Sequence, residues 1–562
     1  MATSPRLIEC VPNFSEGSDM ALIGRLTAVI EAVDGVRLLD VDPGRATNRT
    51  VVTFAGEPEV VIEAAVACVT LAAELIDMAK HHGEHPRFGA TDVCPLVPIA
   101  GVTMEECVEY ARELGRRLGE AGITGYFYEN AATSAQRQNL AVVRAGEYEG
   151  LEKKLADPAW APDFGPAVFN ARAGVTAVSA RDFLVAYNVN LNTTSTRRAN
   201  AIAYDVREKG RKKRESESLT SPLVKDADGK DVWEPGSLKC VKGIGWFIEE
   251  YGVAQISMNL TNISVTPVHI AFDEVEAKAA ARGIRVTGSE LVGLIPLNAM
   301  LDAADHYLTK QSRSLGISDA AKLQIAIKSM GLDELGPFDP AEKIIEYVLA
   351  KGAPKRLVDM TVEGFVHETQ SESMAPGGGS VAANMGALGA ALAGMVANLS
   401  AHKPGWDDRW QLFSGWAEKA KVCTDELVRL VDADTDAFNG IMDAFRMPNG
   451  SEAEKATRAE AVEAATRFAI EVPLRTMQVA FDSFEVIAAM VEEGNPASVT
   501  DAGVGALCAR SAVIGAELNV RVNTKDLKDE VRRAAYLAQA ADLRKRAEAA
   551  EASILQAVEA KL

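Results

Sequence analysis

The residues best suited to chemistry in this sequence lie between His81 and Asp92. Three of the seven histidines of the chain, His81, His82 and His85, fall within five residues, and Arg87 follows them. Histidine is the natural general base near neutral pH. A neighbouring arginine and carboxylates can orient such a base and hold an anionic substrate. The composition of this segment therefore indicates a catalytic site.

The residues alone leave two other interpretations of this segment open. The histidine spacing permits a metal site, but Gly83 and Pro86 interrupt the helix that would align ligands four residues apart. A solvated loop with incidental histidines is the second alternative. A catalytic loop is favoured because glycine and proline fix an irregular backbone where reactive side chains gather.

A second candidate segment is the run Gly377-Gly378-Gly379-Ser380, which precedes a stretch of small residues. Successive glycines at a helix start can expose backbone N–H groups to an anion or a polarised ring. The run is not a P-loop, because it lacks the Lys-Ser/Thr ending. A plain glycine turn with Ser380 as the helix cap is the alternative.

Two further groups of carboxylates and amides could take part in a site. Asp432, Asp434 and Asp436 lie two residues apart in a helical stretch, so they point to different faces and at most two can line one interior site. A solvated acidic face is the alternative. Asp42 ends a strand-like run, where it could orient a histidine or contact a substrate amine, or act only as a turn residue before Pro43.

The elements that must position these residues change character along the chain. Up to about residue 330, short apolar runs typical of strands alternate with amphipathic helical segments, as in α/β layers. Beyond residue 354, helical periodicity dominates, with a break expected near Pro473. We therefore expect two α/β sandwich subdomains with ferredoxin-like layers, followed by an all-α helical bundle. The expected boundaries are 1–178 and 179–335 for the subdomains, 336–354 for a linker and 355–562 for the bundle.

Overall composition excludes several classes of protein. The formal net charge of −20 argues against broad nucleic-acid binding, which requires a basic surface. The uncharged segment 377–400 is long enough to span a bilayer, but it is rich in alanine and glycine, so we expect a packed helix and no membrane span. The seven cysteines form no Cys-X-X-Cys pair, and the first residues lack an apolar signal core. A cytoplasmic location is expected.

The segment 207–239 is poor in apolar residues and is expected to be an exposed insertion. It carries a basic cluster that could steer the glutamate tail of a folate or simply be solvated, with the members Arg207, Lys209, Arg211, Lys212, Lys213 and Arg214.

Several motifs in the first 345 residues resemble one family. The runs Glu-Cys-Val-Pro-Asn-Phe-Ser-Glu-Gly at 9–17, Gly-Glu-His-Pro-Arg at 83–87 and Ala-Pro-Asp-Phe-Gly-Pro at 161–166 are similar to glutamate formimidoyltransferase. That family transfers the formimidoyl group of N-formimidoyl-L-glutamate to tetrahydrofolate. The resemblance implies His85 as the general base and a folate-binding stretch at 165–174. With it we expect substrate or folate contacts from Asp42, Arg87, Gly165, Pro166, Phe169 and Gly174.

The segment from about 355 to 540 resembles formimidoyltetrahydrofolate cyclodeaminase. The resemblance rests on the glycine run, the three aspartates and later Asn-containing runs, in that order. It implies that Asp434 shuttles a proton, with Asp432 as the nearer rival. It also implies folate contacts from Gly377, Gly378, Gly379, Ser380 and Asn523.

The two families are known as a fused bifunctional enzyme in this domain order. The resemblance implies tetrahydrofolate as co-substrate, no metal, and formimidoylglutamate and folates (including polyglutamylated ones) as small-molecule partners. The small-residue helices of the bundle favour a homo-oligomer. A formimidoyltransferase fused to a methenyltetrahydrofolate cyclohydrolase-like bundle, a non-catalytic folate-binding scaffold and a histidine-loop metalloenzyme are the alternatives.

Overall fold

The computed structural model describes residues 6–44, 48–82, 87–216, 221–352 and 355–562. Within these, the chain forms two compact units: one comprises residues 1–303 and 327–351, and the other comprises 304–326 and 352–562. In this division the segment 304–326 belongs to the helical unit, and the expected domain boundaries stay predictions. There Asn398 donates a hydrogen bond to the Gly316 carbonyl at 2.9 Å, and Lys421 pairs with Asp319 at 2.8 Å.

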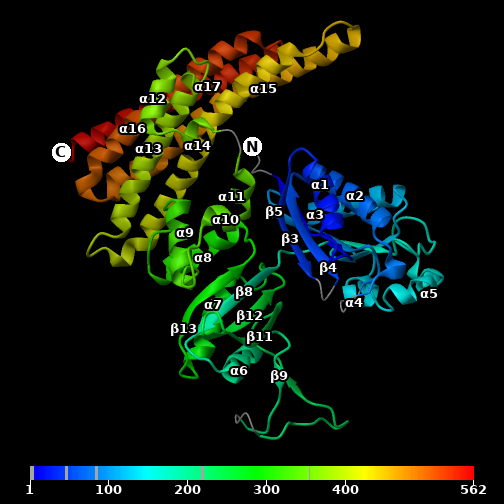
Figure 1. Ribbon diagram of the computed structural model, residues 1–562. Coiled ribbons are helices and arrows are strands. Elements are labelled where there is room, and N and C mark those ends of the chain that lie inside the picture. The colour runs from blue at the N-terminus through cyan, green and yellow to red at the C-terminus, as the bar shows by residue number, and fades with distance from the viewer. Residues whose placement is uncertain (1–5, 45–47, 83–86, 217–220, 353–354) are drawn as a thin grey trace. The chain divides into compact units, whose positions relative to one another are not determined.

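The first subdomain is built on a seven-stranded sheet (Figure 1), whose order is β1-β4-β2-β5-β7-β6 with β3 paired to β4 and β1 also paired to β5. Strands β5, β7 and β6 run parallel and the other pairs are antiparallel. The strands are β1 (Leu7–Cys10), β2 (Asn13–Phe14), β3 (Val36–Gly44), β4 (Arg49–Gly56), β5 (Thr91–Ala100), β6 (Gly125–Glu129) and β7 (Thr176–Ala180).

Three helices contribute apolar side chains to the main core of this subdomain, together with the alternate strand residues that face them. Ile8 and Phe54 of the sheet and Leu26 of the first helix are fully buried in this core. In the strands every second residue lies in this core, and in the helix the buried residues recur about every 3.6 positions. These spacings explain why the segments form strands and an amphipathic helix. The helices are α1 (Met20–Glu31), α2 (Pro58–Leu75) and α3 (Met104–Glu120), with the short α4 (Leu140–Val143) and α5 (Leu151–Leu155) following β6.

The second subdomain has a four-stranded antiparallel sheet with the order β11-β12-β8-β13. Its chain order is strand, helix, strand, strand, helix, strand, which is the ferredoxin-like connectivity. The first subdomain repeats it in β1, α1, β3, β4, α2 and β5. The elements are β8 (Val185–Leu191), α6 (Thr196–Val206), β11 (Val241–Ile248), β12 (Val253–Leu260), α7 (Val268–Ala280) and β13 (Val286–Val292).

The segments around this second sheet complete the α/β half of the chain. The insertion includes a small two-stranded sheet of β9 (Arg211–Lys212) and β10 (Trp233–Glu234). Four helices follow β13, with the bounds α8 (Leu297–Lys310), α9 (Asp319–Met330), α10 (Pro340–Lys343) and α11 (Ile345–Ala350). The parts of α8 and α9 within 304–326 belong to the helical unit. The expected fold class, two α/β subdomains followed by a helical bundle, is confirmed.

The helical unit is a bundle in which α13 packs against α14, α15 and α16, and α15 also packs against α16 and α17 (Figure 1). Small residues on α13 permit close approach, because a Cβ on Gly389 would lie 2.8 Å from the Gly505 carbonyl oxygen of α16. The helices are α12 (Val362–Gln370), α13 (Gly378–Ala401), α14 (Trp410–Arg446), α15 (Glu452–Glu493), α16 (Val499–Asn523) and α17 (Glu530–Glu559).

The predicted break near Pro473 is wrong, because α15 continues through it. Proline lacks the N–H that would bond to the carbonyl four residues earlier, here Ala469. The Asn523 side-chain amide of α16 donates to that carbonyl at 2.7 Å instead. Tertiary contact therefore satisfies the group that proline leaves open, and the helix is not interrupted.

Two helices in the described chain are long and apolar enough to cross a membrane, the segments Gly378–Ala401 and Pro496–Asp526. In the first, 61% of the most apolar window is buried inside the bundle, and in the second 50% is buried. Core packing thus accounts for much of their apolar composition. That neither spans a membrane stays a prediction.

The sheet of the first subdomain depends on glycine at position 89. A Cβ there would lie 2.0 Å from the Val175 carbonyl oxygen, where Gly89 and Gly174 form a backbone bridge. We expect Gly89→Ala to lower the free energy of unfolding by about 1–3 kcal/mol or more, since backbone must move. Differential scanning calorimetry of the whole chain measures this.

Gly24→Ala on the exposed face of α1 is the matched control, because a Cβ there meets nothing within 4 Å. It should stabilise by about 0.5–1 kcal/mol through helix propensity. Equal Tm values for the two alanine variants would contradict the packing role of Gly89.

Candidate functional site

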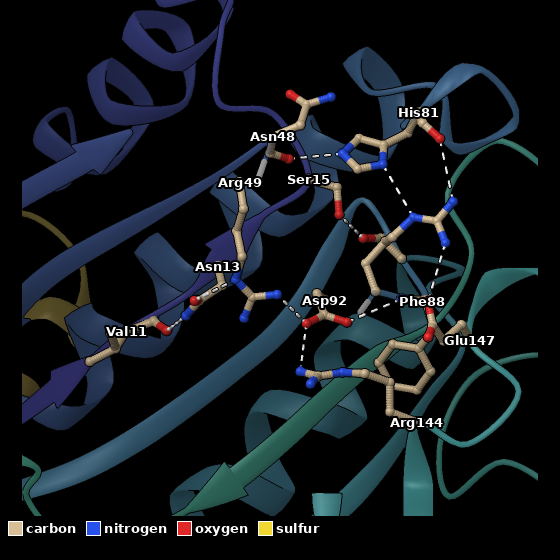
Figure 2. Close-up of polar contacts among 12 residues, drawn as sticks. Val11, Asn13, Ser15, Asn48, Arg49, His81, Phe88, Asp92, Arg144 and Glu147 are labelled. Carbon is tan, nitrogen blue, oxygen red and sulfur yellow. Dashed lines mark hydrogen bonds and ion pairs between the residues drawn. The ribbon is translucent and has the colours of Figure 1, made fainter. Parts of the chain in front are cut away.

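The histidine segment begins in the described chain at His81 and His82, whereas Gly83, Glu84, His85 and Pro86 lie outside the described residues. His81 is buried and uses both ring nitrogens (Figure 2). Arg87 Nε donates to His81 Nδ1 at 3.3 Å, and His81 Nε2 lies 2.8 Å from the Asn48 carbonyl oxygen. A guanidinium can only donate, so Nδ1 accepts and the proton is on Nε2, from which it is donated to Asn48.

His81 therefore has a structural role, because protein groups engage both of its ring nitrogens. Among the residues that the structure describes, no group of three or more His, Cys, Asp or Glu side chains could hold a metal ion. Because His85 is outside these residues, the expectation of no metal stays a prediction.

Asn48 holds the start of the histidine segment, a role that the sequence did not indicate. Its side-chain amide donates to the His82 carbonyl at 2.8 Å, and its Oδ1 accepts from the Gly17 N–H at 3.0 Å. The residue has a φ of +47°, a conformation that asparagine tolerates better than most side chains. At the far end of the segment, Ser15 Oγ donates to the Gly89 carbonyl at 2.7 Å. Residues near β2 and β4 thus fix both ends of the segment.

Arg87 is tied to protein carboxylates. Its Nη1 and Nη2 donate to Glu149 at 3.1 and 2.9 Å, and Nη1 lies 3.5 Å from Glu147. The guanidinium also donates to the His81 carbonyl. Arg87 therefore joins the histidine segment to the segment before α5, and the expected contact with substrate stays a prediction.

Asp92 is fully buried at the start of β5 and binds two arginines (Figure 2). Its Oδ2 accepts from Arg49 Nη1 at 2.5 Å and from Arg144 Nη2 at 2.6 Å, while Oδ1 accepts from the Phe88 N–H at 3.1 Å. Arg49 also donates to Asn13 Oδ1 at 3.0 Å. The sequence indicated Asp92 but neither arginine, because they lie 43 and 52 residues away.

The glycines predicted to contact folate have packing roles of their own. Gly165 has a φ of +75° and a Cβ there would lie 2.0 Å from the Ile123 carbonyl oxygen. Gly174 has a φ of +65°, and a Cβ there would lie 2.3 Å from the Phe88 carbonyl oxygen. These close approaches explain glycine at both positions without a ligand. Folate contact from this stretch stays a prediction.

The remaining predicted residues of this half are Pro166, Phe169 and Asp42, and Phe169 packs on the apolar cluster that contains Phe88. The Pro166 carbonyl accepts from Thr124 Oγ1 at 2.7 Å, and the Phe169 ring lies 5.7 Å from the Tyr148 ring. Asp42 is exposed on β3 opposite Val51. Their roles in binding stay predictions.

In the helical unit, the predicted residues meet around one pocket of about 160 Å³. Asp434 of α14 accepts from the Ser380 N–H at 2.9 Å and from Ser380 Oγ at 3.2 Å, at the start of α13. A Cβ on Gly379 would lie 2.1 Å from Asp434 Oδ1, so only glycine leaves room for this carboxylate. The pocket is lined by Met374, Ala375, Gly377, Gly378, Asp434, Thr435, Ala437, Phe438, Ile441, Ala469, Asn519 and Asn523.

The structure distinguishes the surroundings of the three aspartates, which the sequence alone could not do. Asp432 is buried and accepts from the Leu357 N–H at 2.8 Å, so it fixes the segment before α12. Asp436 is exposed. Asp434 alone of the three lines the pocket, and burial raises the pKa of its carboxyl against the opposing effect of the Ser380 hydrogen bonds. A raised pKa suits a group that exchanges protons near neutral pH.

The basic cluster of the insertion contributes to a second cavity, of about 620 Å³, beside α6. Within it, Arg211 pairs with Asp205 at 3.0 Å and Lys212 pairs with Asp231 at 2.6 Å. These pairs neutralise part of the cluster. Whether the cluster steers a folate tail or is only solvated stays open.

Comparison with known proteins agrees with this arrangement of two α/β subdomains and a bundle. Three family profiles match along the chain: the formiminotransferase domain, N-terminal subdomain (residues 7–181), the formiminotransferase domain (186–350) and formiminotransferase-cyclodeaminase (361–542). The chain is 42% identical to the formimidoyltransferase-cyclodeaminase of Mus musculus, over 94% of each chain. It thus belongs to the formimidoyltransferase-cyclodeaminase family.

Two curated relatives each correspond to one half of the chain. Glutamate formimidoyltransferase of Streptococcus pyogenes is 42% identical over 54% of this chain and 93% of its own length. Methenyltetrahydrofolate cyclohydrolase of Methylorubrum extorquens is 35% identical over 30% of this chain and 81% of its own length.

The raised pKa of Asp434 predicts a pH-dependent stability difference for Asp434→Asn. A carboxyl with a raised pKa in the folded state binds its proton more readily there than in the unfolded chain. The stability that protonated Asp434 contributes is therefore fully present below the pKa of this carboxyl in the unfolded chain. It is lost as the pH rises through the higher pKa of the carboxyl in the folded state. Asparagine does not titrate, so its contribution does not change with pH. The stability of Asp434→Asn should therefore increase relative to that of the wild type as the pH rises.

Urea unfolding of the full chain, followed by helical circular dichroism from acid to neutral pH, measures this difference. A stability difference that is independent of pH would contradict the burial of a titrating carboxylate. Asp436→Asn, at the exposed neighbouring carboxylate, is the control and should change little.

The bond between Asn523 and the Ala469 carbonyl predicts a coupling with Pro473. Asn523→Ala should cost about 1–3 kcal/mol, because the carbonyl loses its donor. In a Pro473→Ala background the restored N–H at 473 can bond to Ala469, so the same change should cost less. A double-mutant cycle of unfolding free energies measures this, and strict additivity would contradict the role assigned to Asn523.

Proposed function

We propose that this chain catalyses two successive folate reactions. The first transfers the formimidoyl group from N-formimidoyl-L-glutamate to tetrahydrofolate. The second cyclises 5-formimidoyltetrahydrofolate to 5,10-methenyltetrahydrofolate and releases ammonia. The observation that carries the proposal is 42% identity along 94% of both chains to a formimidoyltransferase-cyclodeaminase. The Asp434 pocket in the helical unit supports it independently.

In the transfer step, N5 of tetrahydrofolate attacks the amidine carbon of the donor. The bond from that carbon to the glutamate nitrogen breaks, and glutamate leaves after its nitrogen gains a proton. A general base must take the proton of N5, and we assign this role to His85. The bonds from Asn48 to His82 and from Ser15 to Gly89, on either side of His85, support the assignment because they fix both ends of its segment.

In the cyclisation step, N10 of the folate attacks the amidine carbon, and the bond to the terminal nitrogen breaks. That nitrogen must gain protons to leave as ammonia. We assign the proton transfer to Asp434, whose pKa is raised by burial and whose carboxylate lies in the pocket. The backbone N–H groups at the start of α13 can orient the carboxylate and a bound ring, with Gly377, Gly378, Gly379, Ser380 and Asn523 as the neighbouring groups.

The cyclohydrolase relative favours one other function for the helical unit, hydrolysis of a methenylfolate by water. The two functions differ in their nucleophile and in the release of ammonia. We favour cyclodeamination, since the profile of formiminotransferase-cyclodeaminase matches residues 361–542.

The proposal also covers the co-substrate, the need for a metal, the cellular location and the oligomeric state. Tetrahydrofolate is a co-substrate and no resident metal is needed, since amine attack and proton transfer suffice. The folates can be polyglutamylated. We further propose a cytoplasmic homo-oligomer without nucleic-acid partners, in keeping with the acidic net charge of −20.

Two variants of the full chain separate the two steps. His85→Ala should lower transfer about 10²–10⁴-fold yet still cyclise supplied 5-formimidoyltetrahydrofolate. Asp434→Asn should transfer normally, with ammonia release reduced by a similar factor. Methenyl absorbance and an enzymatic ammonia assay measure the steps.

The matched control is Asp432→Asn, whose carboxylate holds the Leu357 N–H rather than the pocket. It should retain most of the ammonia release. Loss of release in Asp432→Asn with retention in Asp434→Asn would reverse the assignment. Hydrolysis of supplied methenyltetrahydrofolate without ammonia from the formimidoyl folate would establish the cyclohydrolase alternative.

A further inference from the structure

We propose that Arg144 binds a glutamyl carboxylate of the transferase substrates, next to the buried Asp92. The inference rests on the proposed transferase function and assigns a binding residue that the sequence did not indicate. Arg144 directly follows α4, and its guanidinium reaches the start of β5 (Figure 2).

At Asp92, two positively charged arginines contact one negatively charged carboxylate. Asp92 supplies a single carboxylate, and its Oδ2 accepts from both Arg49 and Arg144. Arg144 has no other carboxylate within ion-pair distance among the described residues. The Arg144 guanidinium, whose side chain is only 14% exposed, therefore shares the Asp92 carboxylate with a second arginine. A second anion beside Arg144 would be favourable in such a poorly solvated position.

Arg144 also has an unused donor. Its Nε atom is buried and has no hydrogen-bond partner in the described structure. A buried N–H without an acceptor costs free energy, and the large majority of such groups in proteins are satisfied. A carboxylate oxygen of a ligand would satisfy it, and the guanidinium edge suits two parallel N–H···O bonds.

Arg87 makes the contrast clear. Its guanidinium is also largely buried, with the side chain 11% exposed, but Glu149 binds it through both oxygens and Glu147 lies nearby. Arg87 is therefore already matched by protein carboxylates. Arg144, in contrast, keeps an unpaired Nε–H among the described residues.

The position of Arg144 relates it to the transfer chemistry. Asp92, its partner, accepts from the Phe88 N–H, three residues beyond the assigned base His85. The transfer donor is a dicarboxylate, and a folate also carries a glutamyl tail. Both offer the carboxylate chemistry that Arg144 can bind, and kinetics distinguish the two sources.

The test compares Arg144→Gln with wild type in the full chain. We expect the KM of one transferase substrate to rise about 10- to 100-fold, the usual consequence of losing a charge-assisted pair. A rise for formimidoylglutamate alone assigns the carboxylate to the donor. A rise for tetrahydrofolate, absent with tetrahydropteroate, which lacks the glutamyl tail, assigns it to the folate. Arg144→Lys keeps the charge but not the fork, so it should recover part of the affinity.

Arg137→Gln is the matched control, because Arg137 is 11% exposed and pairs one-to-one with Asp163 at 2.5 Å. It should lower stability without a selective KM change. Ammonia release from supplied 5-formimidoyltetrahydrofolate reports on the integrity of each variant. Unchanged KM values in both Arg144 variants, or equal rises for both substrates matched by Arg137→Gln, would overturn the inference. Absence of any transfer by wild type would instead overturn the proposed function.

Discussion

The buried carboxylate of Asp92 is the interaction on which the transferase half depends. It joins the start of β4 through Arg49, the end of α4 through Arg144 and the backbone of Phe88 in one cluster. Burial lowers the pKa of Arg49, and the nearby Asp92 carboxylate opposes this effect. Removing one partner from such a cluster leaves an uncompensated charge, which is strongly destabilising. The same contacts fix the backbone at Phe88, so the packing of β4, α4 and the start of β5 depends on one buried carboxylate.

The helical half uses a related principle, in which a polar group is buried only where the backbone makes room for it. Gly379 leaves space for the Asp434 carboxylate, and the Ser380 N–H and hydroxyl satisfy it. Asn523 bonds to the carbonyl that Pro473 leaves without a donor, and both Ala469 and Asn523 line the same pocket. Pro473 and Asn523 are far apart in sequence, yet together they determine the structure of one wall of the pocket.

Local patterns predicted the alternation of strands and helices, the change to a bundle and the segments that carry chemistry. They could not predict pairings made across the fold. Asn48, Arg49 and Arg144 have no distinctive local signal, since their partners lie tens of residues away. The choice among three aspartates also needed tertiary contacts, because Asp432 reaches Leu357 whereas Asp434 reaches Ser380. The break predicted at Pro473 failed for the same reason.

Transfer and cyclodeamination by one chain can be followed together with formimidoylglutamate that carries nitrogen-15 at the terminal imino nitrogen, mixed with tetrahydrofolate and the full chain. We expect labelled ammonia and methenyltetrahydrofolate to form in equal amounts, while the released glutamate carries no label. Accumulation of labelled 5-formimidoyltetrahydrofolate without labelled ammonia would contradict this expectation.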